Sequence, residues 1–278
     1  MAKKILLACG CSYTDKDYIT FDESLPKEQQ GGWKFWPEIM ADELDLKCVN
    51  VAKSGRGSDY IFNEVTKQIL IYGDRIDTVA ILWSGSDRTS FYTYDFNPLV
   101  EIDDDPSWDN GDGTKYDPFK WMDDIGIGKV NRNFWASQHF NKNTYYQMLE
   151  NQFTKMIAVM DLCKLRNIKI VMGQGLIFFN YYTLESMHKD GRLSEHAYFS
   201  YKELLDYFLK NPFFPYLDKN KKHIIGWPFW NKFGGYTFDD MRYNNEKYFI
   251  SKRDRHPNAA GQQLFADQFI EKYRELYG

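Results

Sequence analysis

The sequence predicts a single α/β domain, in which helices cover both faces of a short parallel β-sheet. Its 278 residues are enough for one large domain of this class, and a content of 43% hydrophobic and 27% charged residues is typical of globular proteins. Short apolar segments alternate with segments of helical periodicity, which is the pattern of strands joined by crossover helices. Three apolar segments lead directly into turns rich in glycine and serine, as expected where parallel strands end at one edge of a sheet.

Four strands and four main helices are predicted. The first strand, residues 3–8, is apolar through its centre and should be buried on both faces. The other predicted strands cover residues 47–52, 78–83 and 168–172, and the predicted helices cover residues 36–46, 59–72, 144–166 and 258–276. Ser58 or Asp59 is the expected N-cap of the second helix, because such side chains accept hydrogen bonds from the free N–H groups of a first turn.

Two long stretches, residues 89–142 and 175–250, lack this periodicity, apart from a helix expected near residues 195–209. No repeat or linker separates them from the rest of the chain. We therefore expect residues 1–278 to form one domain with two insertions.

Composition narrows the classes of function. The net charge is -4 and no block of lysine and arginine is present, so a nucleic-acid partner is not expected. No segment approaches the roughly 18 apolar residues that span a membrane. The apolar run at residues 5–9 is shorter than the roughly 7–15 residues of a secretory signal, and the four cysteines include no Cys-x-x-Cys pair. We therefore expect a cytoplasmic protein with reduced thiols and no membrane association.

The two ends of the chain carry the residues with the clearest chemistry. Ser12 lies in the turn Gly10-Cys11-Ser12-Tyr13-Thr14 after the first strand, and His256 stands two residues after Asp254, just before the last helix. A serine hydroxyl becomes a nucleophile when a histidine takes its proton, and a carboxylate orients that histidine. Each motif alone has a simpler interpretation: a capping serine at the end of a strand, and a solvated start of a helix.

Donors in the glycine turns are candidates for binding the negative charge that develops during acyl transfer. The backbone N–H groups of Ser12 and Gly55 come from the turns after the first and second strands, and Ser86 offers a hydroxyl after the third. If these turns meet at one edge of the sheet, the three donors can surround one oxyanion.

Together, four short blocks resemble the SGNH hydrolase superfamily, also called GDSL-type esterases and lipases. The blocks are Gly10-Cys11-Ser12-Tyr13-Thr14, Asn50-Val51-Ala52-Lys53-Ser54-Gly55, Ser84-Gly85-Ser86-Asp87 and Asp254 to Gly261. The resemblance implies a three-layer α/β/α sandwich that hydrolyses an ester through an acyl-enzyme, without a metal or a cofactor. It also implies that Ser12 is the nucleophile, that His256 is the base and that Asp254 orients the base.

The chain departs from the family pattern at three places. Cys11 replaces an aspartate that is not part of the triad, and Asp254 stands two residues before His256, where three is the commoner spacing. Ser86 stands where the family has its oxyanion asparagine, and the loss of one such donor typically lowers the rate about 10²–10³-fold. The next two residues, Asp87 and Arg88, are expected to contact the substrate.

Aromatic residues make up 18% of the chain and are densest in the second insertion. The favoured interpretation is packing of an irregular segment, or contact between copies of the chain in a homo-oligomer, because aromatic rings bury a large area per residue. The alternative is a platform that lines the substrate cleft, in which Trp227 and Trp230 contact a sugar or an acyl chain. The acidic residues between 103 and 124 lack the register of a calcium loop, so no metal site is expected.

These observations predict a serine esterase that acts on a small O-acyl ester, with an acetyl group on a carbohydrate as the leading candidate. Two alternatives stay open. An acyltransferase to a hydroxyl of a sugar or of peptidoglycan would use the same three residues. The second alternative is a binding or structural protein with weak catalysis on the same α/β scaffold. Ser86, together with the large insertions, favours this hypothesis.

Overall fold

The computed structural model describes residues 3–85, 89–91, 100–102, 142–176, 201–230, 233–243 and 245–278. Within these ranges, five parallel strands form one sheet in the order β2-β1-β3-β6-β7. The strands are β1 (Ile5–Cys9), β2 (Lys47–Asn50), β3 (Ile76–Trp83), β6 (Lys169–Gln174) and β7 (Ile224–Ile225). A separate antiparallel pair, β4 (Thr89–Phe91) and β5 (Val100–Ile102), follows β3.

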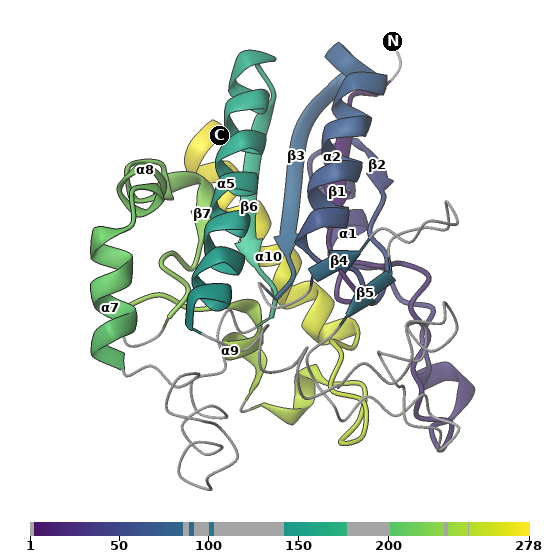
Figure 1. Ribbon diagram of the computed structural model, residues 1–278. Helices are drawn as coiled ribbons and strands as arrows, with labels where there is room; N and C mark the ends of the chain where they lie inside the picture. The colour runs from purple at the N-terminus through teal and green to yellow at the C-terminus, as the bar shows by residue number, and fades with distance from the viewer. Residues whose placement is uncertain are drawn as a thin grey trace, which may run out of the picture.

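Helices cover both faces of the sheet (Figure 1). On one face lie α2 (Ser58–Tyr72) and α5 (Lys142–Leu165), and on the other lie α1 (Trp36–Glu43) and α10 (Ala259–Tyr277). Side chains along β1 alternate between the two cores, so that Leu7 packs with α2 and α5 whereas Leu6 and Ala8 pack with α1 and α10. A strand buried on both faces must be apolar at every position, which explains the continuous apolar run of β1. The three-layer α/β/α fold expected from the sequence is confirmed.

Shorter helices flank the last strand of the sheet. Before β7 come α7 (Tyr201–Lys210) and α8 (Phe213–Lys219), and after it comes α9 (Phe238–Tyr243). Single turns of 3-10 helix are η1 (Lys27–Gln29), η2 (Gly73–Arg75), η3 (Lys221–His223) and η5 (Glu246–Tyr248). Within the described ranges, no helix is both long and apolar enough to cross a membrane.

The structure differs from the predictions at β7 and at the start of α2. β7 lies inside the second expected insertion, and a strand of two residues has no periodicity by which the sequence could reveal it. The N-cap of α2 is Gly57 rather than Ser58 or Asp59. Those two side chains reach α5 instead, since Ser58 Oγ donates to Gln152 at 2.9 Å and Asp59 forms an ion pair with Lys155 at 2.5 Å.

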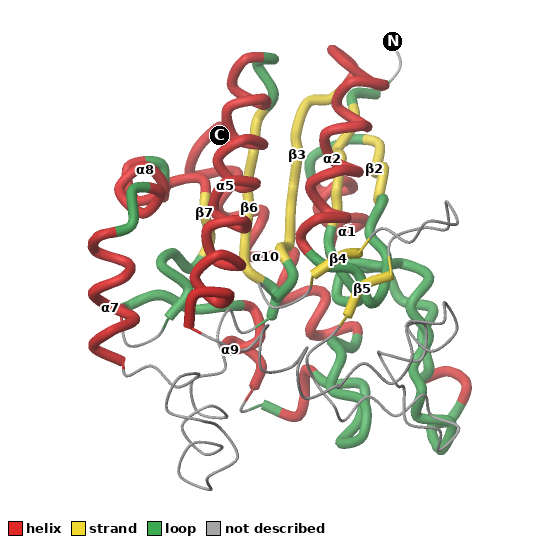
Figure 2. The backbone as a smooth tube through the Cα atoms, in the orientation of Figure 1, coloured by secondary structure: helices red, strands yellow, loops and turns green. Residues whose placement is uncertain are grey.

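The carboxyl ends of the long strands lie at one edge of the sheet, at the bottom of the view (Figure 1, Figure 2). The turn with Ser12 follows β1, and the loop with Gly55 follows β2. Because parallel strands end at the same edge, loops that are far apart in the sequence meet there.

Candidate active site

Ser12 lies in a tight turn directly after β1. The N–H groups of Thr14 and Asp15 both donate to the carbonyl oxygen of Cys11, at 2.9 and 3.0 Å, which folds the chain back around Ser12. At Gly10 the backbone passes so close to β3 that a Cβ atom would lie 2.9 Å from the carbonyl oxygen of Leu82. Glycine alone tolerates such an approach, so the Gly-x-Ser spacing determines where the serine leaves the sheet.

Asp254 and His256 lie on a loop that is fastened by backbone and side-chain hydrogen bonds. The N–H of Ile250 donates to the carbonyl oxygen of His256 at 2.9 Å. Asn258 then caps α10, because its side chain accepts a hydrogen bond from the N–H of Gly261 at 3.0 Å. The start of α10 therefore anchors the loop that carries the histidine.

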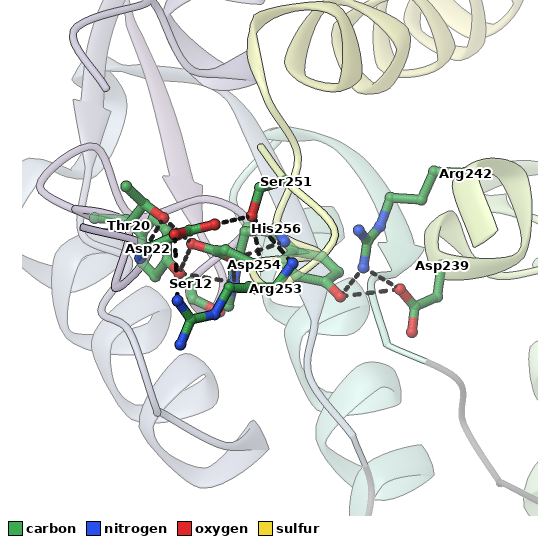
Figure 3. Close-up of polar contacts among 11 residues, drawn as sticks. Ser12, Thr20, Asp22, Asp239, Arg242, Ser251, Arg253, Asp254 and His256 are labelled. Carbon is green, nitrogen blue, oxygen red and sulfur yellow. Dashed lines mark hydrogen bonds and ion pairs between the residues drawn. The ribbon is translucent and has the colours of Figure 1, made fainter. Parts of the chain in front are cut away.

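The structure brings Ser12, His256 and Asp254 together in one hydrogen-bonded row (Figure 3). Ser12 Oγ lies 2.9 Å from His256 Nε2, although the two residues are 244 positions apart, and His256 Nδ1 lies 2.6 Å from Asp254 Oδ1. A carboxylate only accepts hydrogen bonds, so the imidazole proton belongs on Nδ1. Nε2 is then the acceptor that faces the Ser12 hydroxyl.

The two-residue spacing between Asp254 and His256 has a local explanation. Asp254 Oδ1 accepts the backbone N–H of His256 at 3.0 Å, in addition to the contact with Nδ1. A hydrogen bond to the N–H two residues further on is the turn that aspartate side chains favour. This turn places the carboxylate beside the imidazole, so a spacing shorter than the common one still joins the two groups.

Asp254 is completely buried, yet it is held in its charged form. Burial by itself raises the pKa of a carboxyl group. Here the hydrogen bond and charge of His256, together with a hydrogen bond from Thr20, outweigh burial and lower the pKa of Asp254 from 3.8 to about 2. The group beside the imidazole is therefore a carboxylate at neutral pH.

The loop that carries Gly55 is fastened to the turn that carries Ser12. Asp15 Oδ2 accepts hydrogen bonds from both the N–H and the hydroxyl of Ser54, at 2.8 and 2.7 Å. Gly55 has a φ of +74°, a left-handed conformation that favours glycine. The two turns thus lie against each other, and the role of their N–H groups as oxyanion donors stays a prediction.

Ser86, Asp87 and Arg88 lie outside the described residues, so their expected oxyanion and substrate contacts also stay predictions. The chain just before them is described. Ser84 follows β3, is fully buried, and accepts a hydrogen bond from Gln174 Nε2 through its carbonyl oxygen at 2.6 Å. The third glycine turn therefore begins at the same sheet edge as the other two.

Sequence reasoning missed several residues that surround the imidazole. The ring of Tyr18 stacks on His256 with 4.2 Å between centroids, and the ring of Tyr13 meets it edge-on at 5.5 Å. The hydroxyls of Tyr18 and Thr20 donate to Asp254 Oδ2, at 2.8 and 2.5 Å. Tyr18 and Asp254 are 236 positions apart, and no local pattern relates them.

An ion pair between Arg242 and Asp239 contacts the hydroxyl of Tyr13, and Figure 3 shows the two paired side chains. Arg242 Nη2 contacts both the Tyr13 hydroxyl and Asp239 Oδ1, and the same hydroxyl donates to Asp239 at 2.9 Å. The guanidinium lies 4.4 Å from the Tyr13 ring and 5.0 Å from the ring of Phe249. Arg242 Nε and Nη1 are buried without a hydrogen-bond partner in the described part of the chain. This cluster supports the residue that directly follows Ser12.

Trp227 and Trp230 pack into the core next to β7. Trp227 meets Phe153 and Phe214 at centroid distances of 6.1 and 5.1 Å, and Trp230 meets Phe208 at 4.3 Å. In the sheet, β3 and β6 lie between β7 and the strand that leads to Ser12. These contacts agree with the packing interpretation of the aromatic stretch, and a substrate contact by either tryptophan stays a prediction.

Among the residues that the structure describes, no three His, Cys, Asp or Glu side chains are arranged to hold a metal ion.

No protein-family model and no curated protein matches the chain. Solved structures are similar to it over nearly its full length. A catalytic mutant of Axe2, an acetylxylan esterase from Geobacillus stearothermophilus, is 12% identical with a TM-score of 0.45, over 98% of this chain and 94% of that one. A protein assigned to the lipolytic G-D-S-L family of Desulfitobacterium hafniense is 12% identical with a TM-score of 0.44, over 97% and 99%. A member of that family from Veillonella parvula is 12% identical with a TM-score of 0.40, over 99% and 98%. At these values, residue roles in this chain rest on its own geometry.

Proposed function

We propose that the protein is a serine esterase that hydrolyses a small O-acyl ester through an acyl-enzyme. The observation that carries the proposal is the row of hydrogen bonds from Ser12 Oγ through His256 to Asp254, at 2.9 and 2.6 Å. It combines the nucleophile, the base and the orienting carboxylate that acyl transfer requires. The four sequence blocks support an ester as the substrate, and we propose an acetyl group on a carbohydrate as the first class to test.

In the acylation step, Ser12 Oγ attacks the carbonyl carbon of the ester while its proton moves to His256 Nε2. The carbonyl oxygen becomes an oxyanion, for which the N–H groups of Ser12 and Gly55 and the hydroxyl of Ser86 are the proposed donors. Asp254 keeps the other imidazole nitrogen in place and stabilises the imidazolium. When the tetrahedral intermediate collapses, the bond to the alcohol breaks and His256 gives its proton to the leaving alkoxide.

In the deacylation step, a water molecule takes the place of the alcohol. His256 Nε2 accepts a proton from this water as its oxygen attacks the acyl carbon. The bond to Ser12 Oγ then breaks, His256 returns a proton to Ser12, and the carboxylic acid leaves. Each proton that His256 accepts is given back, so the enzyme ends as it began.

The experiment combines active-site labelling with hydrolysis of p-nitrophenyl acetate. We expect a fluorophosphonate probe to label the wild-type protein at Ser12, as located by mass spectrometry of its peptides. In Ser12→Ala, labelling should disappear and kcat should fall at least about 10³-fold, because the nucleophile is gone. Thr154→Ala is the matched control, since it removes an exposed hydroxyl from α5.

Equal hydrolysis by Ser12→Ala and wild type would refute the proposal. Labelling at a serine other than Ser12 would refute it as well. Addition of an acceptor alcohol tests the acyltransferase alternative: formation of a new ester at the expense of free acid would favour transfer over hydrolysis.

A further inference from the structure

We propose that Tyr18 is a positioning residue of the active site, which holds the imidazole of His256 against Asp254 and stabilises the protonated imidazole. The inference rests on the proposed function, because it concerns the base of the esterase reaction. Tyr18 lies outside the four sequence blocks. It belongs to a segment that we call the strap, residues 15–22.

The strap runs from the Ser12 turn to the loop before α10, and from Tyr18 to Asp22 its side chains alternate between a more buried and an exposed position. Thr20 and Asp22 are buried, whereas Ile19 and Phe21 are 74% and 51% exposed. The inner side is fastened to the loop, since Asp22 Oδ2 accepts a hydrogen bond from Ser251 Oγ at 2.5 Å. The strap therefore joins the part of the chain that carries the nucleophile to the part that carries the base.

The strap supplies two of the four hydrogen bonds that the Asp254 carboxylate receives from the described residues. Oδ1 accepts from Nδ1 and from the backbone N–H of His256, and Oδ2 accepts from the hydroxyls of Tyr18 and Thr20. An ionised carboxylate offers about four acceptor positions, so these four donors satisfy it. Removing any of them leaves a buried acceptor without a partner, which is costly for a charged group.

The ring of Tyr18 acts on the imidazole separately from its hydroxyl. The two rings are stacked, with an interplanar angle of 29°, and the hydroxyl lies 2.8 Å from His256 Nδ1. The hydroxyl oxygen thus lies beside Nδ1 while it donates its own proton to Asp254 Oδ2. The face of an aromatic ring attracts a cation within about 6 Å. The stack therefore favours the imidazolium that forms when His256 takes the proton of Ser12.

The surroundings keep Tyr18 a hydrogen-bond donor. Burial, and then the negative charge of Asp254, raise the pKa of Tyr18 above its ordinary value, so the hydroxyl keeps its proton. Among the described residues, the titratable groups that contact the imidazole are Asp254, Tyr18 and Tyr13. Arg242 lies against the Tyr13 ring, and Arg255 is next to His256 in the sequence. Of these, Tyr18 alone contacts both Asp254 and the face of the imidazole.

Two substitutions separate the hydroxyl from the ring. Tyr18→Phe keeps the stack but removes a donor from Asp254, whose carboxylate then attracts the imidazole proton more strongly. We expect kcat to fall about tenfold with KM unchanged, and the acid limb of the kcat/KM profile to move to higher pH. Tyr18→Leu removes the stack as well. Its kcat should fall a further three- to fivefold or so, and its acid limb should lie at lower pH than that of Tyr18→Phe.

The measurements are chosen to exclude a merely structural effect. Rates with p-nitrophenyl acetate are divided by the number of sites that the fluorophosphonate probe labels, so a smaller folded fraction does not count as a lower kcat. The titration of the His256 ring is followed independently by NMR, with its signal identified by its loss in His256→Gln. Ile19→Ala is the matched control on the exposed side of the strap, and its rate and pH profile should equal those of the wild type.

The outcomes distinguish the two proposals. Unchanged acid limbs and unchanged NMR midpoints in both Tyr18 variants would overturn the positioning role, even if the wild type is an esterase. If the wild type shows no esterase activity but the NMR midpoint rises in Tyr18→Phe and is lower in Tyr18→Leu, the proposed function fails while the positioning of His256 stands. If Ile19→Ala shifted the acid limb and the NMR midpoint as much as the Tyr18 variants do, the inference would also be overturned, because the effect would then belong to the whole strap.

Discussion

Asp254 and Arg242 are both buried charged side chains close to the proposed site, and they are accommodated in opposite ways. Among the described residues, His256, Tyr18 and Thr20 donate four hydrogen bonds to the Asp254 carboxylate, at 2.5 to 3.0 Å. Arg242 forms an ion pair with Asp239 through Nη2, while Nε and Nη1 have no hydrogen-bond partner among the described residues. A fully bonded charge has a defined position, which the group that orients a base needs, whereas a partly bonded charge costs stability.

Removal of the Asp254 charge should cause the largest loss of activity. Asp254→Asn keeps the size of the side chain, but an amide does not hold the imidazole proton on Nδ1 as a carboxylate does. We expect kcat for p-nitrophenyl acetate to fall on the order of 10³–10⁴-fold, because Nε2 then no longer accepts the Ser12 proton. The measurement is the steady-state rate for each probe-labelled site.

Asp240→Asn is the matched control for this substitution. Asp240 is half-buried in α9 and accepts hydrogen bonds from the N–H and the hydroxyl of Thr237, at 2.8 and 2.9 Å. Its kcat should stay within a few-fold of the wild type. A loss of less than tenfold in Asp254→Asn would contradict the orienting role of Asp254.

Arg242 should matter for stability more than for the chemical step. Arg242→Met keeps most of the buried volume and removes the ion pair, which leaves Asp239 without its cation. We expect the free energy of unfolding, measured with urea, to fall by about 2–3 kcal/mol. Adding Asp239→Asn should restore most of the lost stability. A double variant as unstable as Arg242→Met alone would show that the loss does not come from the broken ion pair.

Low pH should reduce the contribution of the Asp254 carboxylate to the free energy of unfolding. The pKa of Asp254 is lowered from 3.8 to about 2 in the folded protein, so the folded state binds this proton less readily than the unfolded chain. The contribution of Asp254 to stability is therefore complete above about pH 4 and is lost as the pH falls through about 2. The difference in unfolding free energy between wild type and Asp254→Asn should shrink over this range, and a constant difference would contradict the lowered pKa.

The smallest loss of stability is expected at the ring of Phe249, which is close to two guanidinium groups. Phe249 lies 5.0 Å from Arg242 and 4.9 Å from Arg255. Phe249→Leu keeps an apolar side chain but removes the aromatic face, and it should lower the free energy of unfolding by about 1 kcal/mol. In an Arg242→Met background the loss should be smaller. Equal losses in the two backgrounds would show that the ring does not stabilise Arg242.

Most of the fold could be predicted because burial on both faces makes strands easy to recognise. The predicted strands at residues 3–8, 78–83 and 168–172 overlap β1, β3 and β6, which fill the centre of the sheet. β7 could not be predicted, since two residues at the sheet edge have no pattern of their own. The N-cap of α2 was predicted wrongly because contacts with α5 draw the polar side chains away.

Local sequence accounts for the features of the site that depend on short-range sterics and bonding. Gly10 must be glycine because a Cβ atom there would clash with the side chain of Thr14, four residues further on, and Asp254 reaches His256 through a turn of two residues. The groups that hold the base, in contrast, follow from long-range contacts. Tyr18 is 236 positions from Asp254, and the Tyr13 hydroxyl meets Asp239 across 226 positions. Such contacts follow from how the loops meet at the sheet edge, and no periodicity or local spacing along the chain encodes them.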